Sequence, residues 1–172
     1  MDRSPAPHSS VRGVHLAAFG DHGPVVAGLV DDLLRDPAAL SLVEIEDEVV
    51  AGHVMFTRGL LDAPRRLVDV QVLSPLAVLP SHQRRGIGQA LIRRGLDLLD
   101  RRGVPLVFLE GDPNYYVRAG FEPAVPHGFR KPSLRIPDAA FQVYRLSAYE
   151  PWMTGTLVYP QVFWDHDCVG LR

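Results

Sequence analysis

The sequence has little that points to a disulfide, a membrane or a polyanionic partner. Cys168 is the one cysteine among 172 residues, which excludes an internal disulfide and argues against a structural zinc site. The formal net charge is only -2, so no global field draws the chain to nucleic acid or to an anionic membrane. No hydrophobic run reaches bilayer-spanning length, and residues 1–10 lack the apolar core of a signal peptide. We therefore expect a cytoplasmic protein with no metal, no nucleic-acid partner and no membrane contact.

The remaining composition fits one globular domain. Hydrophobic residues make up 47% of the chain and charged residues 22%, which is enough for a single substantial core. The polar, proline-containing residues 1–10 predict a flexible N-terminal arm, and residues 11–172 the domain itself.

Short apolar patterns outline most of the domain's elements. Helical patterns at residues 14–19 and 24–34 are followed by alternating segments at 40–45 and 49–57, which predict a hairpin. Residues 58–67 resemble a loop, and residues 140–146 a late strand. An aromatic, extended segment follows at 154–163. If its aromatic residues are exposed, the chain could form a homodimer through them: Trp152, Tyr159, Phe163 and Trp164.

Residues 70–102 form the most informative stretch, an apolar strand, a polar turn and an amphipathic helix. Pro75 removes one backbone N–H from the strand and predicts either a bulge or an interruption of the hydrogen-bond ladder. Gly86 and Gly88 precede the helix, where free N–H groups and the helix dipole favour a phosphate. Neither common nucleotide motif fits, because the third glycine of the dinucleotide motif would fall at Leu91 and no Gly-Lys-Ser/Thr follows. The alternative for this stretch is an ordinary polar connection with a glycine turn.

Two linked motifs carry a resemblance to a known family. Gln83-Arg84-Arg85-Gly86-Ile87-Gly88 resembles the Q/R-x-x-G-x-G/A signature of the GNAT superfamily of N-acetyltransferases. The later segment 114–121 is similar to the family's Tyr-x-x-x-Gly-Phe motif, with Tyr116 followed by Gly120-Phe121. Residues 141–143 and 155–160 are similar to the closing segment of a predicted-acetyltransferase branch. The resemblance implies a single α/β (α+β) domain, with a mixed, mostly antiparallel sheet of six to seven strands, splayed at the middle, and helices on both faces.

The resemblance also implies a cosubstrate, acetyl-CoA, and a set of residues that hold it. The splayed strand would pair with the pantetheine arm and supply an oxyanion donor, and the loop would bind the pyrophosphate. Tyr116 would protonate the departing thiolate, while Asn114 would either contact the pantetheine or cap the turn. The neighbouring Tyr115 is interpreted as a packing residue. The implied cofactor-binding residues are Leu76, Ala77, Val78, Gln83, Arg84, Arg85, Gly86, Ile87, Gly88, Gln89, Asn114 and Tyr116.

The general base is the least determined part of the predicted site. Some relatives carry a glutamate or histidine six residues before Val78, where this chain has Val72. Ser74 could hold a water that relays the proton to a group behind it, or the amine could arrive neutral. The candidates behind Ser74 are Glu44, His53, Asp69 and Glu110. His53 is otherwise interpreted as a packing residue, and Glu44 as part of a solvated strand face.

Three classes of function remain open from the sequence. The first is an N-acetyltransferase that passes acetyl directly from acetyl-CoA to the primary amine of a small molecule or peptide. The second is a CoA-binding sensor without catalysis, which the missing base at Val72 favours. The third is another enzyme that acts on phosphate-bearing ligands, which would bind ATP or NAD in preference to CoA.

Overall fold

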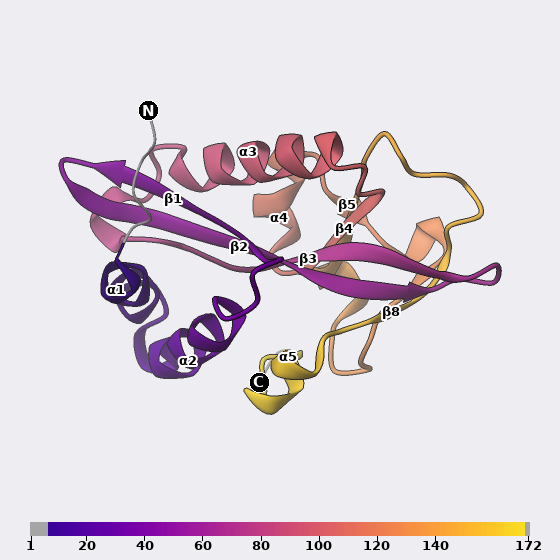
Figure 1. Cartoon of the computed structure of the whole chain (residues 1–172), viewed down its shortest axis with the longest axis horizontal. Coiled ribbons are helices and arrows are strands. Elements are labelled where there is room, and N and C mark those ends of the chain that lie inside the picture. The colour runs from indigo at the N-terminus through magenta and orange to yellow at the C-terminus, as the bar shows by residue number, and fades with distance from the viewer. Residues whose placement is uncertain (1–6, 171–172) are drawn as a thin grey trace.

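A computed structural model describes residues 7–170 of the chain (Figure 1). The strands are β1 Leu40–Glu46, β2 Val49–Asp62, β3 Leu67–Val78, β4 Leu106–Glu110, β5 Glu122–Pro123, β6 Phe129–Arg130, β7 Phe141–Arg145 and β8 Gly155–Val158. The helices are α1 His8–Ala18, α2 Gly23–Leu33, α3 Ile87–Arg101, α4 Pro113–Tyr116 and α5 Gln161–Asp165. Residues 1–6 of the predicted arm lie outside the described residues, whereas residues 8–10 belong to α1 instead of an arm.

The strands form one mixed sheet in the order β5-β7-β4-β3-β2-β8-β6, with β1 pairing to β2. Among the strands of residues 7–170, only β3 with β4 and β6 with β8 pair in parallel. The predicted mixed, mostly antiparallel fold is therefore confirmed. The sheet has eight strands, above the predicted six to seven, because two strands of only two residues, β5 and β6, lie at its edges.

Helices cover both faces of this sheet, as predicted. The side chains of α2 pack with Val70, Val72 and Phe108 on one face. Those of α3 pack with Leu73, Val107 and other residues on the opposite face. The alternation of Val107 and Phe108 between the two cores follows from the pleat, which points successive side chains to opposite faces.

The strand β3 is irregular at Pro75, and this irregularity shapes the site. Val54 pairs with Leu76 and Phe56 with Leu73, so Met55 faces two residues of β3, Ser74 and Pro75. Two residues opposite one define a β-bulge, as the missing N–H of proline predicts. Beyond this point β3 no longer pairs with β4, because the parallel ladder contains only Gln71 with Val107 and Val72 with Phe108. The sheet therefore opens between β3 and β4.

Two expectations about the remaining segments are wrong. Residues 58–62 are not a loop, because β2 continues to Asp62 and pairs with β3 from Gly52 to that residue. The aromatic segment 154–163 ends its strand at Val158 and continues as α5. Tyr159 and Phe163 are buried in the core of the same chain, which removes most of the basis for a dimer through this segment.

Candidate active site

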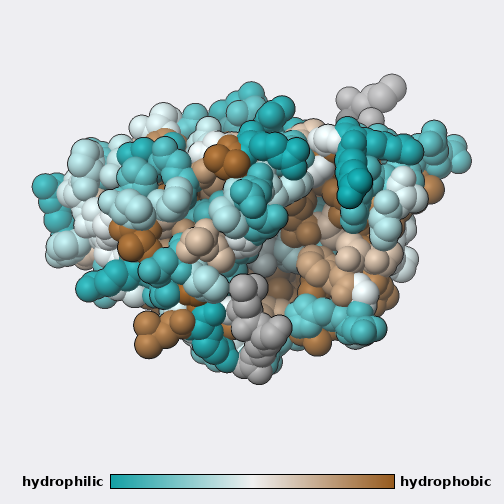
Figure 2. Space-filling model, turned by 180° about the vertical axis from the view of Figure 1, so that it is seen from behind, coloured by the Kyte–Doolittle hydropathy of each residue, from teal (hydrophilic) through white to brown (hydrophobic). Residues whose placement is uncertain are grey.

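A large cleft lies where β3 and β4 separate. Its volume is about 1160 Å³, above the range of roughly 300–1,000 Å³ for typical ligand sites. The splayed ends of β3 and β4, the loop before α3, helices α2 and α4, and the C-terminal segment after α5 all contribute to its walls. Figure 2 shows a hollow on this side of the molecule with hydrophobic side chains beside it. The cleft has room for two ligands together.

The loop between β3 and α3 forms one end of the cleft. Arg84 has φ 64 and Gly86 has φ 81, so left-handed residues alternate with ordinary ones just before the helix. Such an alternation turns successive N–H groups toward one concave side, which suits an anion. Gly86 occupies the N-cap, and buried Ile87 anchors the loop in the core. The Gln83 side chain donates to the Val78 carbonyl at 3.1 Å, which fixes the loop to the end of β3.

The predicted cofactor residues do not all reach this cleft. Nine line it: Leu76, Val78, Gln83, Arg84, Gly86, Ile87, Gly88, Gln89 and Tyr116. Ala77 turns its side chain to Val14 and Val50 beneath α1, so only its backbone can contribute. Arg85 instead pairs with Glu46 at 3.5 Å. Asn114 is exposed, and its N–H donates at 2.9 Å to the Asp112 carboxylate that caps α4.

Two features of the loop end fit a ligand with amide and phosphate groups. The Oε1 atom of Gln89 is buried without a hydrogen-bond partner in a residue that lines the cleft. Buried acceptors are nearly always satisfied, so a ligand N–H is a natural partner. Gly88 is in contact with Tyr115, because an ideal Cβ at position 88 would lie 2.0 Å from the Tyr115 hydroxyl oxygen. Tyr115 also lines the cleft, so it is more than the packing residue that its sequence context predicts.

Tyr116 lies in the cleft beside the opening of the sheet. Its ring packs over Gly111, where an ideal Cβ would lie only 2.6 Å from the ring, and edge-on to Tyr115 at 5.0 Å. Burial, with smaller contributions from Tyr115 and Asp112, raises the pKa of Tyr116 well above its usual value. The phenol is therefore fully protonated at neutral pH and can act as a proton donor.

Glu110 lies at the end of β4, across the opening from Ser74. The last pair of the parallel ladder is Val72 with Phe108; Ser74 and Glu110 each follow two residues later on the separating strands, and both line the cleft. The Gly170 N–H donates to the Glu110 carboxylate at 3.1 Å. Burial raises the pKa of Glu110, against the opposing effects of Gly170 and Arg135.

The other candidates for the base lie away from the cleft. Asp69 pairs with Arg58 at 2.6 Å, and Glu44 with Arg94 at 3.4 Å. His53 is fully buried, with hydrogen bonds to Ser41 at 2.7 Å and to His15 at 2.8 Å. The interpretation of His53 as a satisfied packing residue is therefore confirmed.

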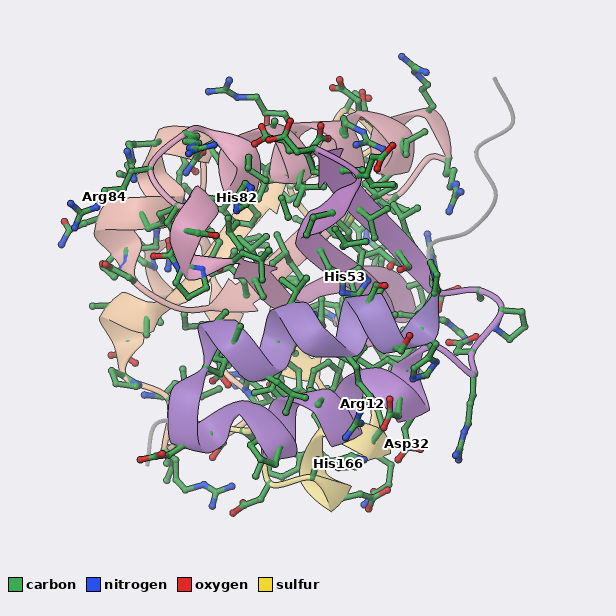
Figure 3. The ribbon with its side chains drawn as sticks, turned by 90° about the vertical axis from the view of Figure 1, so that its left-hand side faces the viewer. Arg12, Asp32, His53, His82, Arg84 and His166 are labelled. Atoms are coloured by element: carbon green, nitrogen blue, oxygen red, sulfur yellow. The ribbon has the colours of Figure 1, made fainter. Side chains whose placement is uncertain are left out.

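Charged side chains line both ends of the cleft. Arg84 and Arg118 line the end at the loop, Glu110 and Asp167 line the end at the C-terminal segment, and Asp112 lines the wall at the start of α4. Figure 3 shows His82 and Arg84 far from His166, which lines the second end. No local pattern in the sequence indicates that residues 166–170 belong to this wall, since His166 contacts Asp32 across 134 positions. No group of three or more potential metal ligands occurs among residues 7–170.

A sheet that opens between two parallel strands, with a glycine-containing loop before a helix at one end and a buried tyrosine beside it, defines the N-acetyltransferase fold class. Comparison with known proteins gives the family. The model of the "Acetyltransferase (GNAT) family" matches residues 12–121. The chain therefore belongs to this family, and the acetyltransferase class predicted from its motifs is confirmed.

Individual relatives agree with this assignment. The chain is 37% identical over 164 residues to "Uncharacterized N-acetyltransferase YjhQ" of Escherichia coli, covering 90% of this chain and 86% of that protein. A crystal structure of YhbS from Escherichia coli in complex with CoA matches with a TM-score of 0.82 and 31% identity, over 94% of this chain and 88% of the other. A GNAT acetyltransferase from Brucella melitensis in complex with acetyl-CoA matches with a TM-score of 0.72 and 32% identity, over 95% and 96% of the chains.

The described part of the chain contains no helix long and apolar enough to cross a membrane.

Proposed function

We propose that this chain transfers an acetyl group from acetyl-CoA directly to the primary amine of an acceptor. One observation carries the proposal: a single cleft has cationic groups at one end, a carboxylate at the other, and a protonated tyrosine beside the opening between them. This charge distribution suits a diphosphate at one end and an ammonium group at the other.

The cosubstrate would enter along the gap between β3 and β4. Its diphosphate would lie on the backbone N–H groups of residues 84–89, with the Arg84 side chain adding a charge-assisted contact. The pantetheine arm would run beside residues 76–78, where β3 has no partner on the β4 side. The relatives crystallised with CoA and with acetyl-CoA, which match over more than nine-tenths of this chain, support this placement.

In the transfer step, the amine nitrogen attacks the thioester carbonyl, a C–N bond forms and the C–S bond breaks. A backbone N–H near Ala77 or Val78 would stabilise the oxyanion, a contribution worth about 3 kcal/mol in comparable sites. Tyr116 would give its proton to the leaving thiolate. This completes the proton balance once a base has taken the proton of the amine.

We assign the base to Glu110, because it is the carboxylate at the opening of the sheet. Ser74 lies across the opening and would hold the water through which the proton passes. Burial raises the pKa of Glu110, and a higher pKa makes a carboxylate a stronger base. Position 72 cannot supply the base, because its side chain is a valine that is only 1% exposed and packs in the core.

A CoA-binding sensor without catalysis is the second candidate function. The valine at position 72 favours it, since a common place for the base is lost. Glu110 and Tyr116 favour catalysis, because both bring titratable groups to the same cleft. The half-buried, free Cys168 fits a reducing compartment, so we place the activity in the cytoplasm.

Release of free thiol from acetyl-CoA in the presence of an amine panel separates the two functions. The enzyme predicts amine-dependent thiol release and an acetylated amine by mass spectrometry, whereas the sensor predicts CoA binding with neither product. Tyr116→Phe should lower kcat by about a hundredfold and leave CoA affinity within twofold, because only the proton is lost. Tyr144→Phe is the matched control, since Tyr144 packs on Phe121 outside the cleft. Equal turnover in both variants would remove Tyr116 from the acid role.

A further inference from the structure

The half of the cleft opposite the phosphate loop has an apolar wall and an acidic wall. The apolar wall consists of Phe19, Val25, Val26 and Leu29, from α2 and the turn before it, and the same turn also contributes His22. The acidic wall consists of Glu110 together with the C-terminal residues 166–170. In Figure 2, hydrophobic side chains gather beside the hollow. Any acceptor bound here therefore contacts hydrocarbon on one side and a carboxylate on the other.

The apolar wall is fixed by the residues behind it. Val26 and Leu29 are 5% and 1% exposed, so α2 is seated in the core while Val25, 38% exposed, faces the cleft mouth. Asp31 of α2 is bound by His8 and Arg12 of α1. This attachment holds α2 at one flank.

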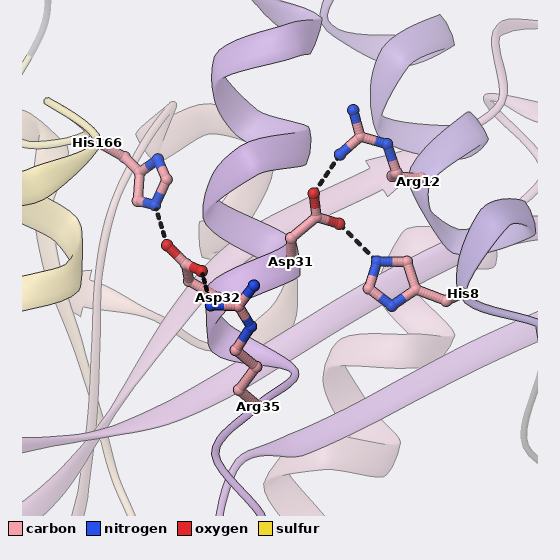
Figure 4. Close-up of polar contacts among 6 residues, drawn as sticks. All are labelled: His8, Arg12, Asp31, Asp32, Arg35 and His166. Atoms are coloured by element: carbon pink, nitrogen blue, oxygen red, sulfur yellow. Dashed lines mark hydrogen bonds and ion pairs between the residues drawn. The ribbon is translucent and has the colours of Figure 1, made fainter.

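The acidic wall is attached to the same helix. His166 bonds Asp32 at 2.6 Å, and Asp32 also pairs with Arg35 at 3.0 Å (Figure 4). The His166 hydrogen bond lowers the pKa of Asp32. Both walls of the acceptor half are therefore held in place through α2, and a preorganised site selects its ligand by shape and charge.

The charges of this half provide for one ammonium group. Among the described carboxylates that line the cleft, Asp112 caps α4 and Asp167 lies 3.8 Å from Arg135, while Glu110, which accepts the Gly170 N–H at 3.1 Å and is influenced by Arg135, lies at the opening of the sheet. A second ammonium group on the acceptor would lie against Val25, Val26 and Leu29. Losing its hydration there without a counter-ion is costly.

We propose that the acceptor is a primary monoamine on an apolar body, such as an arylalkyl or alkyl amine, and that Val25 helps to select it. The inference rests on the proposed acetyl transfer and names its substrate class. The amino group lies at Glu110, next to the thioester, and the apolar body packs on α2. Linear polyamines and aminosugars are disfavoured, because their further polar groups meet the apolar wall.

The test compares phenethylamine, spermidine and an aminosugar as acceptors for three proteins: the unaltered chain, Val25→Glu and Leu67→Glu. Leu67 is the control, since it is 56% exposed at the end of the sheet away from the cleft. For the unaltered chain and Leu67→Glu, kcat/KM should be at least about tenfold higher for phenethylamine than for the other two amines. Val25→Glu should lower kcat/KM for phenethylamine about tenfold and raise it severalfold for spermidine.

A preference of the unaltered chain for spermidine or the aminosugar would overturn the inference, and so would identical profiles for Val25→Glu and Leu67→Glu. Both results leave the acetyltransferase function intact. If no amine releases thiol, the proposed function fails instead. Calorimetry with the CoA-saturated protein then tests the amine preference by itself. The inference requires that phenethylamine binds more tightly than spermidine, and that Val25→Glu reverses this order.

Discussion

Gly88→Ala is expected to have effects of opposite sign depending on the residue at position 115. Its added Cβ would lie 2.0 Å from the Tyr115 hydroxyl oxygen, but 3.4 Å from ring atom Cζ and 3.7 Å from Val78 Cγ2. Because non-bonded atoms prefer about 3.5 Å, the hydroxyl must retreat by about 1.5 Å. Tyr115 would then lose its edge contact with Tyr116 at 5.0 Å and its place under Arg118 at 5.4 Å.

The magnitude follows from three contributions. Loss of the aromatic pair costs about 0.5–1.5 kcal/mol, and loss of the cation–π contact about 0.5–1 kcal/mol. Alanine in a helix gains up to about 1 kcal/mol over glycine. Gly88→Ala alone should therefore lower the free energy of unfolding by about 0–1.5 kcal/mol and weaken CoA binding. In the Tyr115→Phe background the nearest ring atom is an ordinary contact, so the same change should stabilise the chain by about 1 kcal/mol.

Urea unfolding and CoA titration of the four proteins in this cycle measure both effects. The hydroxyl contact predicts a coupling free energy of at least about 1 kcal/mol between positions 88 and 115. Additive effects, with Gly88→Ala equally harmful in both backgrounds, would refute the contact and with it the role of Tyr115 at the loop end of the cleft.

Three further predictions follow from the site and its surroundings. Glu110→Gln should lower kcat/KM by about a hundredfold at neutral pH and abolish the acidic limb of the pH profile of kcat/KM. An unchanged pH profile would exclude Glu110 as the base. Arg84→Ala should weaken CoA binding about tenfold, while Arg85→Ala, whose side chain pairs with Glu46 outside the cleft, should change it less than about twofold; equal losses in calorimetry would contradict this difference. Burial lowers the pKa of His15 to about 4, and burial with the nearby His15 lowers that of His53 to about 3. Because both histidines take up a proton near pH 6.5 in the unfolded chain, the free energy of unfolding should fall as the pH drops from 6.5 toward 4, by up to about 2.7 kcal/mol per pH unit. The fall should be smaller in His53→Gln. The same slope in both proteins would contradict a lowered pKa for His53.

The features that could be predicted from the sequence are those set by local chemistry. Pro75 lacks an N–H, so the bulge in β3 followed from its position in an apolar strand. Gly103 and Gly120, both with positive φ, follow the end of α3 and of the helical turn after α4, as glycines commonly do. The loop before α3 was recognisable because Gly86 and Gly88 stand at a fixed distance from the strand.

The features that could not be predicted depend on contacts between distant segments. Residues 58–62 resemble a loop by composition, yet pairing with β3 keeps them in a strand. The C-terminal wall of the cleft depends on the contact between His166 and Asp32, which no local pattern indicates. Ser74 and Glu110 line one cleft because β3 and β4 separate just before them, and that separation exists only once the sheet has formed. The acceptor half of the site was therefore the part that the sequence left open.

A crystal structure of this chain with CoA is the most direct test of the central claim. We predict that the pantetheine arm lies between β3 and β4 beyond Val72, and that the diphosphate lies on the backbone N–H groups of residues 84–89. A complex with CoA bound elsewhere, or with the space between these strands closed and empty at saturating CoA, would contradict it.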